Sequence, residues 1–317
     1  DVGMCQQTGS GIWRKGDILM QRSAARSPNR IRRTKGEVVF DTVNYIVLSL
    51  LGIITLYPII NVLAISLSSY TGYLQNPAMI LPAEFNLDAY KTILSNPLIM
   101  SSYSNTITVA LLGTVINVVL TVVTAYPLAK EKVRGSRALM FGIVFTMMFS
   151  GGIIPTFLVV RSLHLLDTLW ALILPCAMTT TNFIIVKNFF ENIPDSIEES
   201  AKMDGAGDFR ILWTIVVPLS IPVLATVTLF YAVSNWNRLF DAVMYINSRS
   251  NWTLPILLKE IITENSDLLA DPSVINQVMP KTMQCATIVV TILPIMLVYP
   301  FLQRYFMKGI MLGAVKG

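Results

Sequence analysis

The sequence predicts an all-α membrane protein that crosses the bilayer six times, with a polar loop of short helices on the cytoplasmic side. Apolar residues make up 53% of the 317-residue chain and charged residues only 14%, and the mean hydropathy is +0.60. Apolar runs of about 20 residues, enough to span about 30 Å of hydrocarbon as a helix, recur along the chain. Soluble domains carry more charge than this, so we expect a polytopic helical bundle.

Six segments have the length and composition of membrane-spanning helices. All are rich in Leu, Ile, Val, Phe and Met, and lipid-embedded helices tolerate scattered Gly and Pro when neighbours satisfy the freed backbone groups. The six segments are residues 43–68, 103–128, 138–160, 169–190, 219–245 and 283–306. We therefore expect a transmembrane domain over 38–306, between a basic segment at 1–37 and a tail at 307–317.

The positions of Lys and Arg orient the six spans, because cytoplasmic loops keep positive charge. With the N-terminus inside, 18 of the 24 Lys and Arg residues fall on the inner side. The sequence therefore predicts that both termini are cytoplasmic. Residues 1–37 lack the apolar core of a signal peptide and are expected to be mostly disordered. The net charge of +5 follows from topology and lipid contact and gives no reason to expect nucleic-acid binding.

A polar island separates the fourth and fifth apolar segments. Ser196 and Glu199 have the spacing of a capping box, which predicts the start of a short helix. Gly205 predicts its end, because glycine accepts the left-handed conformation that follows a helix C-terminus. Asp208 is expected to cap a second short helix. The loop 195–213 is therefore expected to form a cytoplasmic knob of two angled helices.

Patterns for catalysis or metal binding are absent from the sequence. There is no Gly-x4-Gly-Lys-Ser/Thr phosphate loop, no Gly-x-Ser-x-Gly turn and no His-Glu-x-x-His helix. Cys5, Cys176 and Cys285 lie far apart, which predicts neither a metal site nor a disulfide framework. His164 is expected to be an ordinary residue of an outer turn rather than a proton relay. We therefore expect no catalytic residue, no metal and no cofactor bound by this chain.

The island resembles the signature loop of a known family. The family pattern is Glu-Ala-Ala, three residues, Gly, nine residues and Ile-x-Leu-Pro, and Glu199, Gly205 and Ile215 have these spacings. Ser200 replaces an Ala and Val217 replaces the Leu, both small changes in volume. The island is thus similar to the cytoplasmic coupling loop of permease subunits in ATP-binding-cassette (ABC) importers, which docks on a separate ATPase.

Further segments narrow this resemblance to carbohydrate uptake. Residues 149–156, 165–168 and 230–237 resemble the carbohydrate branch of these permeases, and within it the polysaccharide and oligosaccharide members, some of which carry acidic sugar chains. The likeness covers about residues 38–317. The chain looks like the shorter, six-span partner, similar to the second permease of the maltose system.

The resemblance implies partners and site residues. In this family two related permeases pair in the bacterial plasma membrane, two ATPases that bind ATP and Mg dock beneath, and an extracytoplasmic binding protein delivers the solute. This chain would move a carbohydrate by alternating access. The expected ATPase-coupling residues are Glu199, Ser200, Ala201, Met203, Asp204, Gly205, Ala206 and Phe209. The ending resembles a tail that reaches between the ATPase subunits, which places Gly313, Lys316 and Gly317 at that interface.

The fifth segment carries polar residues that predict a substrate pathway. Tyr231, Asn235, Arg238 and Asp241 recur at three- and four-residue steps and so share one face of a helix. Polar groups at this depth are costly against lipid, so we expect them, with Trp236, to face the partner or a wet cavity. Equally open is that Trp236 is an interface anchor and that Arg238 and Asp241 form a simple ion pair.

Other transport mechanisms stay open from the residues alone. Peptides or amino acids are alternative solutes for an importer of this kind. An ion-driven transporter would be expected to show inverted repeats and intramembrane carboxylates, whereas the six segments carry almost no carboxylate besides Asp241. A membrane enzyme acting on lipid-linked sugars would need clustered carboxylates or His at one interface. The long outer loops, about 70–102 and 246–282, are expected to fold on the surface and receive the binding protein.

Overall fold

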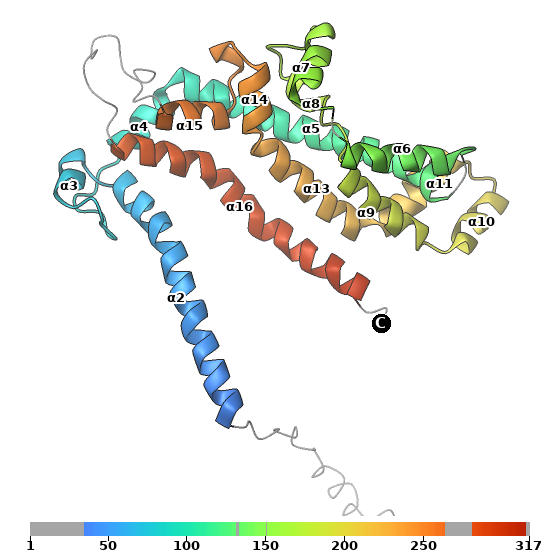
Figure 1. Ribbon diagram of the computed structural model, residues 1–317, viewed down its shortest axis with the longest axis horizontal. Helices are drawn as coiled ribbons and strands as arrows, with labels where there is room; N and C mark the ends of the chain where they lie inside the picture. Colours follow the sequence, from blue (N-terminus) through green and yellow to red (C-terminus); the bar gives the residue numbers. More distant parts are fainter. Residues whose placement is uncertain (1–34, 131–132, 150, 264–280, 315–317) are drawn as a thin grey trace, which may run out of the picture. The chain divides into compact units, whose positions relative to one another are not determined.

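Helices make up nearly all of the regular structure in the computed structural model, which describes residues 35–130, 133–149, 151–263 and 281–314 (Figure 1). Among these residues the sole extended pairing is an isolated bridge between Ser68 and Phe85. The all-α fold class is therefore confirmed. The prediction of disorder falls, for residues 1–34, outside the described residues.

The chain divides into two units, residues 1–56 and residues 57–317. The first unit holds the beginning of α2 (Lys35–Ser66), and the second holds its last turns and every later helix. The later elements are α3 (Tyr70–Gln75), α4 (Asp88–Ser95), α5 (Pro97–Ala129), α6 (Ser136–Met148), α7 (Ile153–Ser162), α8 (Trp170–Ile173), α9 (Thr180–Glu191), α10 (Asp195–Met203), α11 (Asp208–Ile211), a π-helical turn (Leu212–Val216), α12 (Val217–Leu219), α13 (Ile221–Trp236), α14 (Leu239–Tyr245), a 3-10 turn (Arg249–Asn251), α15 (Leu254–Thr263) and α16 (Lys281–Ala314).

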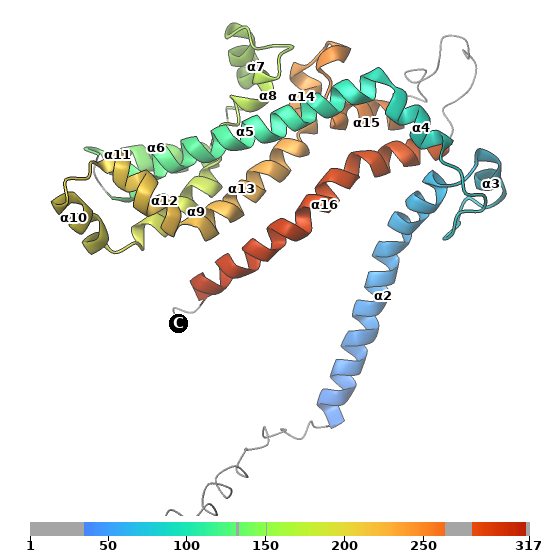
Figure 2. The ribbon, with the colours of Figure 1, turned by 180° about the vertical axis from the view of Figure 1, so that it is seen from behind.

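The central element of the second unit is α5, a single helix of 33 residues. The Asn96 side chain caps its first turn by accepting a hydrogen bond from the Leu98 amide at 2.9 Å, and Pro97 fits the first helical position, where an amide hydrogen is not needed. At 1.5 Å per residue α5 is about 50 Å long. It packs along α9 and α13, and α13 packs in turn against α16 (Figures 1 and 2).

The largest buried apolar cluster lies where α5, α9, the π-helical turn and α13 meet. Phe183 and Phe190 of α9 and Ile211 of α11 are fully buried there, beside Tyr231 of α13. Burial of one such side chain contributes about 1.5–3 kcal/mol. The cluster therefore holds the short helices that follow α9 against the long helices.

By length and composition, two of the described helices can cross a membrane alone: Val39–Ser66 and Pro97–Ala129. Two bent pairs raise this to four spans if each pair is one span; these are Ser136–Met148 with Ile153–Ser162 and Asp208–Leu219 with Ile221–Trp236. Within α16, the residues Lys281–Leu297 form a shorter apolar stretch. The count of six spans and the orientation of the termini stay predictions.

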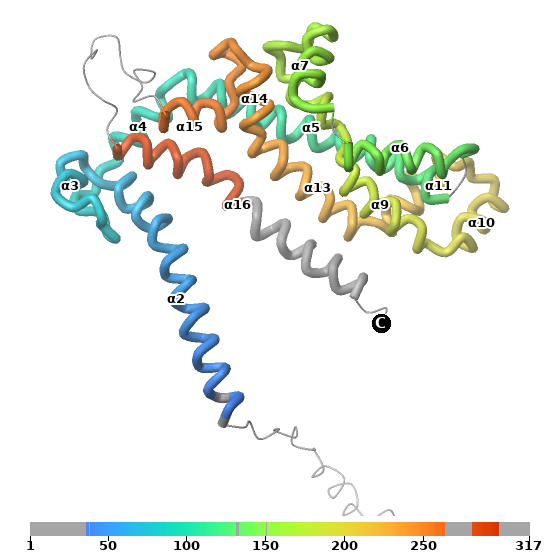
Figure 3. The backbone as a smooth tube through the Cα atoms, in the orientation of Figure 1, coloured from blue at the N-terminus to red at the C-terminus, as the bar shows by residue number. Residues whose placement is uncertain are grey.

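Three of the expected continuous spans are interrupted, the third of the six between α6 and α7. The fourth expected span breaks between α8 and α9. The fifth breaks after Trp236, because Arg238 has a ψ of 75°, outside the helical region, and α14 begins only at Leu239 (Figure 3). The prediction that Tyr231 to Asp241 share one face of one helix was therefore wrong, since Asp241 belongs to α14.

Candidate functional site

The polar island folds into short helices, as the sequence predicts. We call residues 195–213 the knob; it contains α10, α11 and the first residues of the π-helical turn. The segment from Asp208 to Leu219 meets α13 at a bend of 85°, beside the fully buried Ser220. Figures 1 and 2 show α10 and α11 at the end of α5 that lies away from α4 and α15. The knob therefore projects from one end of the long helices.

Gly205 ends α10 in the way that its position predicts. Its φ is +82°, in the left-handed region. The Gly205 amide donates to the Lys202 carbonyl at 2.9 Å, and the Ala206 amide donates to the Ala201 carbonyl at 3.0 Å. These two bonds form a Schellman motif, which satisfies carbonyls that the helix end would leave unpaired. Lys202 and Asp208 then approach to 3.7 Å across the turn and link α10 to α11.

The two predicted helix caps were wrong. The residue before α10 is Pro194, and neither Ser196 nor Glu199 makes a cap, because Asp195 already lies inside the helix. Gly207 occupies the capping position of α11, and Asp208 is its first helical residue. Asp195 and Asp208 still place negative charge in the first turns, where the helix dipole favours it.

The outer face of the knob carries large apolar side chains. Met203 is 89% exposed and Phe209 is 74% exposed. The Phe209 ring meets Trp213 edge to face at 6.2 Å, one turn further along. On the opposite face Ile211 and Leu212 are buried in the core. An apolar face on a polar loop is typical of a surface that another protein covers.

The remaining predicted coupling residues divide between the two faces. Glu199, Ser200 and Asp204 are exposed. Ala201 and Ala206 are half-buried and pack against the core cluster. Small side chains at these two positions let α10 and the following turn lie close to the long helices.

A charge cluster around the buried pair of Lys130 and Glu198, which the sequence did not lead us to predict, holds α10 to the end of α5. Glu198 is 4% exposed, and one of its oxygens lies 3.5 Å from Lys130 Nζ, while Tyr126 donates its hydroxyl to the other at 3.1 Å. Lys130 Nζ also donates to the Ile193 carbonyl and to Asp195 Oδ1, each at 2.8 Å. Two features of the sequence are consistent with this cluster. Glu198 directly precedes Glu199, the Glu of the family pattern, and Lys130 lies at the end of the second apolar segment.

The predicted tail residues are only partly described. Gly313 lies in the last turn of α16. Lys316 and Gly317 lie outside the described residues, so their predicted role at an ATPase interface stays a prediction.

Four of the five predicted pathway residues form a hydrogen-bond network between helices. The Tyr231 hydroxyl lies 2.7 Å from Thr121 Oγ1, and Asn235 donates to Asn117 Oδ1 at 3.0 Å, so α13 is tied to α5 twice. Arg238 then donates to Asn235 Oδ1 at 2.7 Å and to Asp241 Oδ2 at 2.9 Å. This geometry favours the ion-pair interpretation of Arg238 and Asp241.

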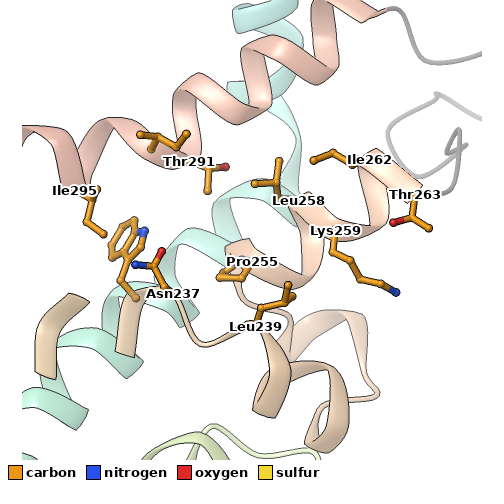
Figure 4. A pocket seen from close by; sticks show the side chains of 11 residues that line it. Asn237, Leu239, Pro255, Leu258, Lys259, Ile262, Thr263, Thr291 and Ile295 are labelled. Carbon is orange, nitrogen blue, oxygen red and sulfur yellow. The ribbon is translucent and has the colours of Figure 1, made fainter. Parts of the chain in front are cut away.

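Trp236, the fifth of these residues, lies apart from this network and lines a pocket of about 440 Å³ (Figure 4). The Asn237 amide lies at one end of this pocket, and Lys259 and Thr263 of α15 lie at the other. The residues between them come from α14, α15 and α16 and are apolar apart from Thr291. Trp236 is thus the one predicted pathway residue that lines this pocket.

A second polar cluster joins the turn after α7 to the segment after α14. Asp167, with a left-handed φ of 59°, accepts the amides of Asn247 at 3.0 Å and Ser248 at 2.8 Å, and the Ser248 hydroxyl as well. These hydrogen bonds, the Ser248 hydroxyl first, hold the pKa of the Asp167 carboxyl below its usual value. We call this cluster the Asp167 latch.

Comparisons with known proteins support the resemblance of the knob to the coupling loop of ABC importer permeases. The model of the family described as "Binding-protein-dependent transport system inner membrane component" matches residues 117–311. The polygalacturonan/rhamnogalacturonan transport system permease protein YtcP of Bacillus subtilis (strain 168) is 44% identical over 282 residues, 88% of this chain and 99% of that protein. Protein LplC of the same bacterium is 44% identical over 290 residues, 90% of this chain and 98% of that protein.

A solved structure has the same fold. It is the crystal structure of a bacterial ABC transporter involved in the import of the acidic polysaccharide alginate; one of its chains matches with a TM-score of 0.82 at 36% identity, over 86% of this chain and 99% of that one. The family match spans the knob and the helices around it. This chain therefore belongs to the inner-membrane components of binding-protein-dependent transport systems, the permease subunits of ABC importers.

Proposed function

We propose that this chain is one of two paired permease subunits of an importer that moves an acidic oligosaccharide or polysaccharide fragment into the cytoplasm. The main support is the likeness to the polygalacturonan/rhamnogalacturonan permease over nearly the whole of both chains. The alginate importer structure adds a second relative with an acidic glycan as substrate. The shared chemistry of these substrates is a chain of sugars that carries carboxylates.

The proposed partners supply what this chain lacks. Two ATPases that bind ATP and Mg dock beneath the paired permeases, one of them on the knob, and a binding protein delivers the glycan from outside. ATP closes the ATPases, the knob moves with them, and the helices turn so that the cavity opens outward, takes the glycan and reopens inward after hydrolysis. The exposed Met203 and Phe209 support a protein partner at the knob.

The proposal is tested first by isolating the chain with its partners. A tagged chain is purified from native membranes in mild detergent, and the proteins that accompany it are identified by mass spectrometry. A second permease and an ATPase are expected. A chain that purifies alone and still transports would refute the borrowed ATPase and favour an ion-driven mechanism.

The substrate class is tested by uptake into proteoliposomes that contain the purified complex. With the binding protein and ATP present, labelled oligogalacturonate is expected to enter and neutral maltooligosaccharide of equal length to enter more slowly. Equal uptake of both glycans would refute the preference for acidic sugars. Uptake of a peptide in place of either glycan would refute the carbohydrate assignment.

The docking surface is tested by truncating its most exposed ring. Covering a Phe side chain on binding is worth about 1.5–3 kcal/mol, so Phe209→Ala is expected to weaken ATPase retention about 10- to 100-fold. Leu81→Ala is the matched control, because Leu81 is 78% exposed in the loop between α3 and α4, outside the knob. Wild-type retention of the ATPase by Phe209→Ala would contradict the proposed surface.

A further inference from the structure

The Lys130 clamp, formed by Lys130, Asp195 and Glu198, joins the knob to the long helix α5. The ammonium lies 2.8 Å from an Asp195 oxygen and 3.5 Å from a Glu198 oxygen. The side chains of Lys130 and Glu198 are only 6% and 5% exposed. Breaking contacts between buried charges is far more costly than breaking a surface ion pair. The knob therefore cannot shift along α5 without breaking these contacts.

The opposite end of α5 holds another segment by directed hydrogen bonds. Asn105 Nδ2 donates to the Ser250 carbonyl at 2.8 Å and to the Trp252 carbonyl at 2.9 Å. Thr106 Oγ1 accepts the Leu254 amide at 2.8 Å. These bonds connect α5 to the backbone of residues 250–254, which lead into α15.

One unbroken helix thus connects two clamped segments. From Asn105 to Lys130 the distance along the axis is about 37 Å at 1.5 Å per residue. In both ribbon views α10 and α15 lie toward opposite ends of α5 (Figures 1 and 2). Because α5 is continuous over this distance, a displacement applied at one end is passed along it toward the other.

We infer that Lys130 is a positioning residue for transport: it makes the knob and α5 move together and so links the ATPase side to residues 250–254. The inference rests on the proposed function, because it takes the knob to be the ATPase dock. The apolar packing of Ala201 is non-directional, whereas the charge clamp specifies one arrangement of α10 on α5. Loss of the clamp should uncouple ATP hydrolysis from movement of glycan while leaving the docking face intact.

The test uses three variants of the full chain in the purified complex. Lys130→Met removes the ammonium and keeps an apolar chain of similar length. Lys130→Arg keeps the charge in the same place. Lys187→Met is the matched control, because Lys187 pairs with Glu191 one turn along the same helix and joins no two elements.

The quantity measured is glycan molecules taken up per ATP hydrolysed, together with the amount of ATPase that copurifies. For Lys130→Met we expect normal copurification and a ratio reduced about 5- to 150-fold, the usual range of a coupling free energy between two sites. Lys130→Arg is expected to retain most of the ratio. Lys187→Met is expected to stay within about twofold of wild type, because an ion pair four residues apart on one helix contributes little.

Two results would overturn the inference. One is a wild-type ratio for Lys130→Met; the other is a parallel loss of ATPase and uptake, which would make the clamp a purely structural contact. If Lys130→Met does not accumulate, Glu198→Gln is measured in the same way, because it keeps a partner for the Tyr126 hydroxyl.

Failure of the proposed substrate is recognisable in the same experiment. A wild-type complex that hydrolyses ATP but takes up no glycan refutes the substrate and leaves the clamp testable. The clamp is then tested by measuring how far the binding protein stimulates ATP hydrolysis. Loss of this stimulation in Lys130→Met, with normal basal hydrolysis, supports the clamp. Full stimulation in Lys130→Met overturns it.

Discussion

Alanine in place of Gly205 is expected to loosen the end of α10 without any steric clash. No atom outside the neighbouring residues lies within 4 Å of the position that a Cβ would occupy. The cost is therefore conformational, because Gly205 has a φ of +82° and an L-residue in that region is less stable by about 1–2 kcal/mol. This free energy corresponds to about a 5- to 30-fold increase in the open population of the turn.

Hydrogen exchange of peptides that cover residues 195–206 measures this opening. The amides of Gly205 and Ala206, which close the Schellman motif, should lose about 5- to 30-fold protection in Gly205→Ala, the factor that corresponds to about 1–2 kcal/mol. Gly205→Asn should lose less, because Asn tolerates the left-handed region. Gly142→Ala is the control. Gly142 lies inside α6, and no atom outside the neighbouring backbone lies within 4 Å of the position that its Cβ would occupy, so alanine there should not affect the knob.

Equal protection in wild type, Gly205→Ala and Gly205→Asn would refute the argument from backbone strain. A comparable loss in Gly142→Ala would show that the effect is not specific to the turn.

Three further predictions concern the contacts between helices. The Asp167 carboxyl has a lower pKa in the folded protein than in the unfolded chain, so its contribution to stability is present above the usual carboxyl range and is lost as pH falls through the folded pKa. The hydrogen-exchange protection of the Ser248 amide, corrected for the intrinsic effect of pH, should therefore fall at acid pH. Asp167→Asn should show this reduced protection at every pH. A pH-independent protection in the wild type would contradict this. Gly113→Ala would place a Cβ 2.9 Å from Asn235 Nδ2 and would force this hydrogen-bonded side chain to shift, so it should lower the free energy of unfolding in detergent by about 1–3 kcal/mol. An unchanged unfolding temperature would contradict the close packing of α5 on α13. Tyr231→Phe leaves the Thr179 amide, 3.2 Å from the hydroxyl, without that acceptor and should cost about 1–3 kcal/mol in the same assay; a neutral result would mean that the hydroxyl is not part of the network.

Features that depend on local chemistry were predictable from the residues. A low share of charged side chains and long apolar runs require helices in lipid, whatever their packing, so the all-α class followed directly. Gly205 ends α10 because only a residue without Cβ enters the left-handed region at no cost. The spacing of Glu199, Gly205 and Ile215 was sufficient for the family, which the comparison over residues 117–311 confirms.

Features that depend on distant parts of the chain needed the folded structure. The capping box was wrong because α10 begins after Pro194, and this N-cap lies two residues earlier than the Ser196 that the side-chain spacing suggests. The helical face from Tyr231 to Asp241 was wrong because the backbone leaves the helix at Asn237 and Arg238. The period of an apolar segment does not reveal such a break, since both sides of it are equally apolar.

The pairing of Lys130 with Glu198 shows most clearly the difference between what the sequence specifies and what only the folded structure specifies. Each residue is an ordinary charge at the end of a helix in the sequence, 68 positions apart. Folding brings α5 and α10 together over the core of Phe183, Phe190 and Ile211, removes both charges from water and places them 3.5 Å apart. Residue identity specified the helices, the membrane and the family. Burial, which no single segment encodes, made this pair one of the contacts that join the knob to α5.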